Sequence, residues 1–241
     1  MFSKILSAGI LQTAPDGYRY LNRGHNRILV LIPGWAFDAK IFEPLDLDFD
    51  YLIPRKIDIA RFNADLADAL FQKKIKEVSL LGWSMGGFLA VGFLKEYGEA
   101  VRDIFLVSMR RSYSRQEIRS ESTELKKDPT AYLTAFYRNC FMGQTHAFRW
   151  FKKHLFRSYI ENFDMGSLLR GLDYLMQQEL EPALLKRDNT HIIHGKKDRI
   201  APLSEILEFL GAPPFPPVSI IEKTGHLPFL EPGFKEGIKR L

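Results

Sequence analysis

A serine between two glycines is the residue of this chain best placed to act as a nucleophile. The sequence GWSMG at positions 82–86 puts Ser84 directly after the apolar run Glu77–Leu81 and before a segment of helical spacing, Met85–Tyr97. A serine hydroxyl is a weak nucleophile at neutral pH, so it needs an adjacent base and a position that exposes it to substrate. A sharp turn between a strand and a helix provides that position. We therefore predict that Ser84 is a nucleophile of acyl transfer; the alternative is a glycine-rich turn with an inactive serine.

An acid and a base follow Ser84 in the order that this chemistry needs. Asp198 comes shortly after the apolar run Thr190–Ile193, and His226 comes a few residues after the run Val218–Ile221. In a catalytic triad the aspartate holds the imidazole in the tautomer that accepts the serine proton, and it stabilises the imidazolium that forms. Taken singly, an aspartate in a turn is often only a turn former. Together and in this order, Asp198 and His226 predict a triad with Ser84.

The negative oxygen of a tetrahedral intermediate needs two backbone N–H groups nearby. One comes from the residue after the nucleophile, which is Met85. The second is expected from the loop after the first buried strand, where PGW occupies positions 33–35, and we assign it to Trp35. The indole of Trp35 is also a candidate wall of the substrate pocket.

These candidate residues all follow apolar runs, and the runs alternate with segments of helical spacing. Such an alternation predicts an α/β fold with a mostly parallel central sheet and helices on both faces. Ile5–Leu11 is expected to be a first strand rather than a signal peptide, because no small-residue cleavage site follows it. Pro232–Leu241 is predicted to be a final helix. The predicted strands of the sheet are Arg27–Ile32, Glu77–Leu81, Asp103–Val107, Thr190–Ile193 and Val218–Ile221.

The alternation stops between Met109 and about Arg187, where no strand-like run occurs. Three helical patterns occupy this segment, which predicts a helical insertion over the carboxyl edge of the sheet. We expect one domain over residues 1–241, with a core at 1–109 and 188–241 and a helical lid at about 110–187. The three helical patterns are Thr130–Phe141, His146–Ile160 and Ser167–Leu180.

The predicted lid has a basic face and an aromatic face. Between Arg110 and Arg170 there are 12 Lys/Arg against 6 Asp/Glu, whereas the whole chain has a net charge of +5. An aromatic face suits an acyl chain above Ser84, and a basic face suits an acidic partner. The alternative is a set of core-packing helices with a solvated charged face. The candidate binding residues are Phe136, Arg138, Phe141, Arg149, Lys153 and Arg157, with Trp35 from the core.

Composition argues against several other classes of protein. The chain has 241 residues, 46% of them hydrophobic, and can bury one substantial core. No apolar run approaches the ~20 residues of a membrane span. The single cysteine, Cys140, cannot form an internal disulfide, so we expect a cytoplasmic protein. We also expect a monomer. His191 and His194 suggest a metal pair, but residues three apart on a strand point to opposite faces. Motifs that cradle nucleotide phosphates are missing, and acyl transfer by a serine needs no cofactor. No metal is expected because no further ligand cluster is nearby, and no nucleic acid because the lid aromatics lie on apolar helix faces. No membrane partner is expected either.

Four phrases carry a resemblance to a known family: IPGWAFD, LLGWSMGG, HGKKDRIAP and GHLPFLEP. They look like the α/β-hydrolases, and they are similar to the pimeloyl-[acyl-carrier-protein] methyl ester esterases of biotin synthesis. The resemblance implies the α/β-hydrolase fold, Ser84, Asp198 and His226 as the triad, and the amides of Trp35 and Met85 as the oxyanion hole. It covers the sheet from about residue 28 to 229, while the lid matches only in general character.

Two departures from the family pattern bear on substrate identity. Many relatives have His-Gly where this chain has Pro33-Gly34, although that histidine is not a triad member. The Asp-x-Pro-Gly-x-Gly loop usual after the next strand is replaced by a shorter, more charged segment at residues 53–63. The pocket is therefore expected to differ in shape.

The resemblance implies a serine carboxylesterase acting on pimeloyl-[acyl-carrier-protein] methyl ester, with an acyl carrier protein as the partner that brings the acyl group. Two alternatives stay open. One is a general short-chain carboxylesterase or thioesterase with the same chemistry. The other is a non-catalytic binding protein that uses the basic lid to bind an acidic partner.

Overall fold

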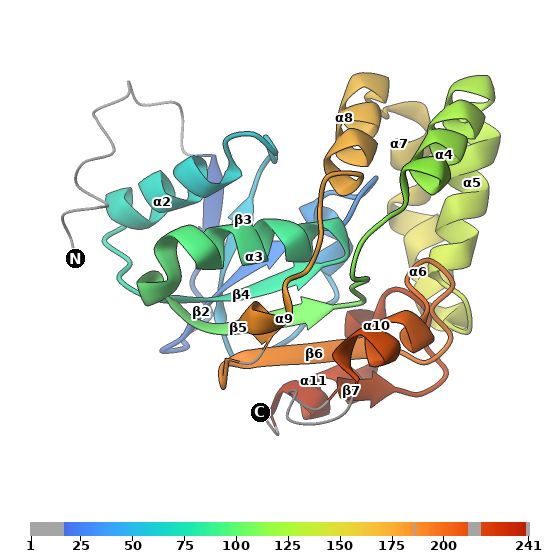
Figure 1. The fold of residues 1–241 in the computed structure, drawn as a ribbon. Helices are drawn as coiled ribbons and strands as arrows, with labels where there is room; N and C mark the ends of the chain where they lie inside the picture. The colour runs from blue at the N-terminus through green and yellow to red at the C-terminus, as the bar shows by residue number, and fades with distance from the viewer. Residues whose placement is uncertain (1–16, 186, 212–217, 240–241) are drawn as a thin grey trace.

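A seven-stranded sheet forms the centre of the computed structural model, which describes residues 17–185, 187–211 and 218–239 (Figure 1). The strand order is β1-β3-β2-β4-β5-β6-β7. β1 pairs antiparallel with β3, and every other neighbouring pair is parallel. The strands are β1 (Tyr18–Leu21), β2 (Ile28–Ile32), β3 (Asp50–Pro54), β4 (Val78–Trp83), β5 (Val101–Val107), β6 (Thr190–Gly195) and β7 (Val218–Ile221).

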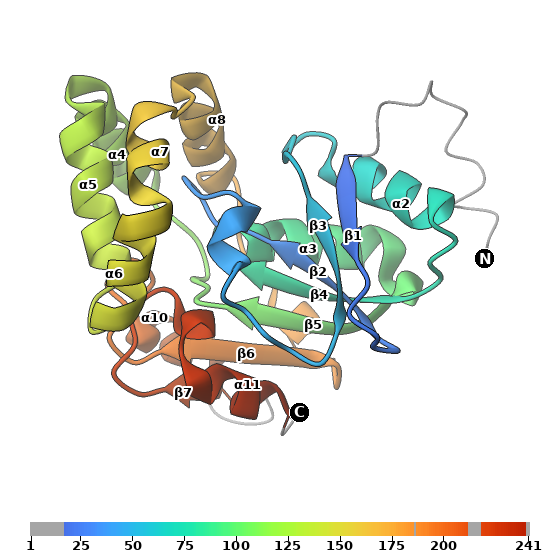
Figure 2. The same cartoon turned by 180° about the vertical axis from the view of Figure 1, so that it is seen from behind.

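Helices cover both faces of this sheet, which is why its central strands are apolar on both sides. α2 (Phe62–Gln72) and α3 (Met85–Tyr97) pack on the face toward the viewer in Figure 1. η1 (Ala39–Phe42), η3 (Pro228–Leu230) and α11 (Pro232–Lys239) lie on the other face (Figure 2). The short elements η2 (Gly98–Ala100), α9 (Pro182–Leu185) and α10 (Leu203–Leu210) complete the core of the fold.

Five helices gather beyond the carboxyl ends of the strands, and we call them the cap helices (Figures 1 and 2). Their starts follow from local sequence. Ser114 and Asp128 each accept a hydrogen bond from a backbone N–H of the first turn that follows, and Asp164 does the same for the last helix. The cap helices are α4 (Arg115–Lys127), α5 (Pro129–Cys140), α6 (Thr145–His154), α7 (Phe156–Glu161) and α8 (Met165–Leu175).

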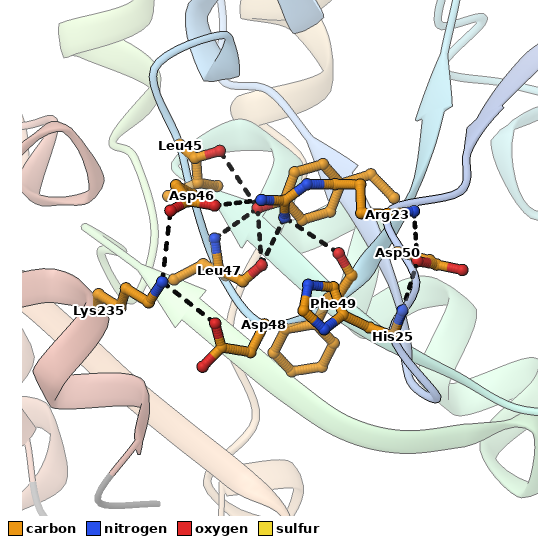
Figure 3. Close-up of polar contacts among 10 residues, drawn as sticks. Arg23, His25, Leu45, Asp46, Leu47, Asp48, Phe49, Asp50 and Lys235 are labelled. Carbon is orange, nitrogen blue, oxygen red and sulfur yellow. Dashed lines mark hydrogen bonds and ion pairs between the residues drawn. The ribbon is translucent and has the colours of Figure 1, made fainter.

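A polar network at the other end of the sheet joins segments that are far apart in the sequence (Figure 3). Asp50 accepts hydrogen bonds from the backbone N–H groups of Arg23 (2.7 Å) and His25 (3.1 Å). The Arg23 guanidinium forms an ion pair with Asp46 and donates to the Phe49 carbonyl. Lys235 of α11 reaches the same Asp46. The network therefore fixes the loop before β3 between the β1–β2 loop and the last helix.

The five strands predicted within the sheet are present, and the mostly parallel α/β architecture is confirmed. β1 and β3 were missed, as were α2, α4 and α10. The prediction of one continuous helix over His146–Ile160 was wrong, because the helix is interrupted at Leu155 (φ −124°) and divided into α6 and α7. The strand predicted at residues 5–11 lies outside the described residues. Within the described part of the chain, no helix is long and apolar enough to cross a membrane.

Candidate active site

Ser84 occupies the sharp turn between β4 and α3. Its φ is 53° and its ψ is −122°, a conformation that non-glycine residues rarely adopt and that marks functional turns. The turn is possible because Gly86 has no side chain: a Cβ there would lie 2.3 Å from the Ile32 carbonyl oxygen. The Ser84 N–H donates to the carbonyl of Val107 (2.9 Å), which fixes the turn against β5. Ser84 is therefore held rigidly at the carboxyl edge of the sheet.

Asp198 and His226 meet at the same edge. Asp198 follows β6 and His226 follows β7, and His226 Nδ1 lies 2.8 Å from Asp198 Oδ2. The other carboxylate oxygen, Oδ1, accepts the backbone N–H groups of Ile200 and Ala201, both at 2.9 Å. Burial alone would raise the pKa of Asp198, but the charge and hydrogen bond of His226 lower it below its usual value. Asp198 is thus an anion fixed in place to orient the imidazole.

A second histidine, His194, lies near the same oxygen of Asp198. Its Nε2 is 2.6 Å from the carbonyl oxygen of Ala201 and 3.5 Å from Asp198 Oδ2, so the ring proton belongs on Nε2. The ring is fully buried, and its Nδ1 has no hydrogen-bond partner among the described residues. Burial lowers the pKa of His194, so the ring is neutral and leaves Asp198 available to His226.

Two aromatic side chains contact the triad candidates from the core. The indole Nε1 of Trp83, which precedes Ser84, donates to the His226 carbonyl (2.7 Å). The Tyr113 hydroxyl lies near the Ser84 side chain, and the Arg110 guanidinium lies 4.6 Å from the Tyr113 ring centroid. Burial raises the pKa of Tyr113, while Arg110 and Ser84 oppose the rise. Tyr113 is therefore a neutral hydroxyl beside the nucleophile.

The loop after β2 passes beside Ser84 and is held by the cap helices. A Cβ on Gly34 would lie 3.1 Å from the Ser84 Cβ, so the peptide between Gly34 and Trp35 runs past the nucleophile. The Trp35 indole donates to the Leu168 carbonyl of α8 (2.8 Å), and Tyr137 of α5 donates to the Ala36 carbonyl (2.8 Å). The predicted oxyanion residues Trp35 and Met85 thus come from two sides of Ser84.

A cavity of about 1070 Å³ opens between this loop and the cap. Gly34, Trp35 and Met85 line it on the sheet side, and Tyr159 and Leu168 line it on the cap side. Ser84, His226 and Asp198 do not belong to its wall. The cavity therefore reaches the two predicted oxyanion residues, which adjoin Ser84, but not the triad side chains themselves.

The predicted lid residues take three kinds of position. Phe136 packs edge-on against Trp35, with ring centroids 4.9 Å apart, and neither Phe136 nor Phe141 lines the cavity. Phe141 is buried among other rings of the cap and stacks on Phe151. Arg138, Arg149, Lys153 and Arg157 are exposed, and Arg157 pairs with Glu161 at 2.8 Å. The basic residues are therefore available to a partner, although the break at Leu155 puts Arg157 on a separate helix.

Sequence reasoning missed several residues that contact the site. Tyr113 and Gln144 are polar residues at the start of helical segments, and nothing in their spacing distinguishes them from ordinary surface residues. Trp83 was visible as part of the GWSMG motif, but not as a hydrogen-bond donor to His226. In the described part of the chain, no three His, Cys, Asp or Glu side chains converge as a metal site would require.

Comparisons with known proteins place this geometry in a family. A family model described as "Alpha/beta hydrolase family" matches residues 14–234. The chain is 25% identical to the pimeloyl-[acyl-carrier protein] methyl ester esterase of Xylella fastidiosa (strain M23), over 86% of this chain and 91% of that protein. The protein of the same name from Aliivibrio fischeri (strain MJ11) is also 25% identical, over 86% and 89%.

Solved structures share the fold at lower identity. An esterase from Exiguobacterium antarcticum matches with a TM-score of 0.75 at 19% identity, covering 92% of this chain and 93% of that one. A bromoperoxidase from Bacillus anthracis matches with a TM-score of 0.76, also at 19% identity and the same coverage. The family model and the sheet topology confirm the fold class and the resemblance stated from the sequence. The chain therefore belongs to the alpha/beta hydrolase family.

Proposed function

We propose that this protein is a serine carboxylesterase with Ser84 as nucleophile, His226 as base and Asp198 as the orienting acid. The observation that carries the proposal is the 2.8 Å contact between His226 Nδ1 and Asp198 Oδ2, at the sheet edge where Ser84 occupies its strained turn. A base oriented in this way is what a serine hydroxyl needs to attack an ester.

The reaction proceeds in two steps. Ser84 Oγ attacks the ester carbonyl and gives its proton to His226 Nε2, while the backbone N–H groups of Trp35 and Met85 stabilise the oxyanion. The intermediate collapses, His226 returns the proton to the leaving alkoxide, and the alcohol departs. Water, deprotonated by His226, then attacks the acyl-enzyme, and the carboxylic acid leaves with Ser84 restored. The Asp198 carboxylate stays ionised throughout.

The proposed substrate is a pimeloyl-[acyl-carrier-protein] methyl ester, from which methanol leaves. Relatives of that name match 86% of the chain. The cavity of about 1070 Å³ is slightly larger than the roughly 300–1,000 Å³ of ligand pockets, so it has room for a long acyl group beside the proposed oxyanion residues. Exposed basic residues of the cap, Arg138, Arg149, Lys153 and Arg157, suit the acidic surface of a carrier protein.

A fluorophosphonate probe tests the chemistry. We expect the wild-type protein to label at one site and the Ser84→Ala variant to remain unlabelled, because only an activated serine reacts with such a probe. Mass spectrometry of the labelled peptide identifies the residue. Equal labelling of both proteins, or none of the wild type, would contradict the triad.

The substrate is tested separately by comparing two esters. We expect kcat/KM for a carrier-bound pimeloyl methyl ester to exceed that for a short p-nitrophenyl ester. The protein should also restore growth without biotin to a host that lacks its own pimeloyl esterase. A labelled enzyme that prefers the short ester and fails to restore growth would be a general esterase.

A further inference from the structure

Gln144 is a buried polar side chain of the cap that contacts the loop carrying His226. It is 2% exposed and lies at the start of α6. Its Oε1 accepts the Gly225 N–H (3.1 Å), and its Nε2 donates to the Leu227 carbonyl (2.8 Å). Nε2 also lies 3.2 Å from Glu231 Oε1. One side chain therefore holds the residues on both sides of His226.

The backbone of the same turn, residues 140–144, packs directly on the backbone of the histidine loop. The His226 N–H donates to the Cys140 carbonyl (2.8 Å). A Cβ on Gly225 would lie 2.6 Å from that carbonyl oxygen, and one on Gly143 (φ 79°) would lie 2.4 Å from the Lys223 oxygen. Because both glycines lack side chains, the two segments approach closely enough for the Gln144 amide to reach across.

The histidine loop needs such support because it has no secondary structure of its own. Residues 224–227 lie between β7 and η3 and belong to neither a strand nor a helix. The Asp198 carboxylate fixes the ring of His226, and the Trp83 indole fixes its carbonyl. Without Gln144, the Gly225 N–H and the Leu227 carbonyl would lose their partners in a buried site, which favours rearrangement of the loop.

Only a carboxamide of this length satisfies both groups. An amide has an acceptor and a donor on one planar group, whereas an ionised carboxylate accepts only and a thioether offers neither strong donor nor strong acceptor. This requirement explains a glutamine, rather than an acid or an apolar residue, at a position buried between the cap and the sheet edge.

We propose that Gln144 is a positioning residue for His226, so that reaction at Ser84 depends on the packing of the cap turn at residues 140–144 against the histidine loop. The proposal rests on the proposed function, since it takes His226 as the base. It assigns to the cap a role in catalysis as well as in substrate binding, because the turn that holds the histidine loop joins two cap helices.

The test compares Gln144→Met, which keeps the length of the side chain and removes its three hydrogen bonds, with wild type. The control is Leu125→Ala, a buried residue of α4, which packs on α5 and α8. We expect Gln144→Met to lower kcat for a p-nitrophenyl ester about 10- to 100-fold, because a displacement of about 1 Å at a reacting group has an effect of that size. KM should stay within about threefold of wild type, since the cavity is untouched.

A second readout does not depend on turnover. The imidazole N–H proton of His226 that is bonded to Asp198 should give a downfield proton NMR resonance, identified by its loss in His226→Ala. We expect Gln144→Met to broaden or remove this resonance and Leu125→Ala to retain it. If Gln144→Met does not fold, Gln144→Asn serves instead, because it keeps the amide but is one methylene too short to reach both Gly225 and Leu227.

Two outcomes would overturn the inference. One is a wild-type kcat and resonance in both Gln144 variants. The other is an equal loss of kcat and resonance in Leu125→Ala, which would mean that any loosening of the cap has this effect. A wild-type protein that fails to label with fluorophosphonate would overturn the proposed function instead, and the resonance would still show whether Gln144 positions the ring.

Discussion

At the scale of single residues, the site combines a strained nucleophile with a histidine pair that shares one carboxylate. Ser84 keeps its φ of 53° because β5 and the tight approach of Gly86 hold it there. Both His226 and His194 lie near Asp198 Oδ2, at 2.8 Å and 3.5 Å. The two histidines differ in their partners, since only His226 has its Nδ1 bonded to the carboxylate.

The buried neutral His194 leads to a prediction about stability and pH. Its pKa is lowered in the folded protein, so the unfolded chain binds an extra proton once the pH falls below about 6.5. Stability is therefore lost as the pH drops from about 6.5 toward the folded pKa, at a slope of up to about 1.4 kcal/mol per pH unit for one proton. The lowered pKa of Asp198 acts in a more acidic window, below its unfolded value of about 3.9.

Urea unfolding at pH 7.0, 6.5, 6.0 and 5.5 measures the effect of His194. We expect the free energy of unfolding of His194→Gln to fall less steeply than that of wild type, because the glutamine amide keeps a donor for the Ala201 carbonyl without titrating. His146→Gln, at an exposed position of α6, is the matched control and should follow wild type. Parallel slopes for wild type and His194→Gln would rule out this assignment.

At the scale of elements, the cap helices and the loop after β2 form one contact region. Trp35 donates to α8 and Tyr137 of α5 donates to Ala36, a residue with a φ of 61°. Tyr159 of α7 donates to Asp38 Oδ1 at 2.6 Å. Three cap helices therefore hold the loop that carries the proposed oxyanion amide of Trp35.

Gly171 of α8 is the place where this contact is tightest. A Cβ there would lie 2.5 Å from Trp35 Cδ1 and 3.0 Å from its Nε1. We expect Gly171→Ala to lower the free energy of unfolding by about 1–3 kcal/mol, because overpacking displaces the indole or the helix. It should also lower kcat, because displacement of the Trp35 indole would shift the backbone N–H of Trp35 that is proposed to stabilise the oxyanion.

Gly166→Ala, on the same helix, is the control for this substitution. Its Cβ would approach only the exposed side-chain ends of Arg170 (3.1 Å) and Asp164 (3.3 Å), and neither contact is closer than 3.0 Å. Its stability should stay within about 1 kcal/mol of wild type. Chemical denaturation measures the free energy of unfolding of both variants, and steady-state kinetics measures their kcat. Equal effects of the two substitutions would contradict the importance of the contact between Gly171 and Trp35.

At the scale of the whole molecule, the elements with strong local signals were predictable. The motif at residues 82–86 and the apolar runs before Asp198 and His226 predicted that all three residues follow strands of one parallel sheet, and the strands before them, β4, β6 and β7, are present in that sheet. β3 was missed because it begins with a charged residue, Asp50, which does not look like part of a buried strand. The Asp50 carboxylate can be buried because it accepts hydrogen bonds from Tyr20, Arg23 and His25. Gln144 was missed because its role exists only when α6 meets the loop after β7.

The charge distribution of the cap gives a prediction for the molecule as a whole. We expect the triple variant Arg149→Glu, Lys153→Glu, Arg157→Glu to lose turnover of a carrier-bound ester, because exposed basic residues attract an acidic partner at long range. The loss should shrink with added salt, since screening acts over about 10 Å at 0.1 M. Turnover of a p-nitrophenyl ester should be unchanged.

A variant with three exposed charges reversed elsewhere is the control for this experiment. Arg19, Lys74 and Lys76 are exposed and lie outside the cap helices. Their reversal to Glu should leave turnover of the carrier-bound ester close to wild type. If both triple variants lose activity equally, the effect belongs to net charge, and if the cap variant also loses the small ester, the cap has been destabilised.

The position of His226 after β7 has a consequence for folding during synthesis. The strands from β4 to β7 lie in the sheet in the order in which they leave the ribosome, so each new strand can add to an edge that already exists. Ser84 is synthesised early, and Asp198 is synthesised after the cap. The histidine loop forms its hydrogen bonds to residues 140–144, so it can reach its final conformation only after that cap turn has folded. A nascent chain therefore completes its sheet and cap before the proposed active site can hydrolyse an ester.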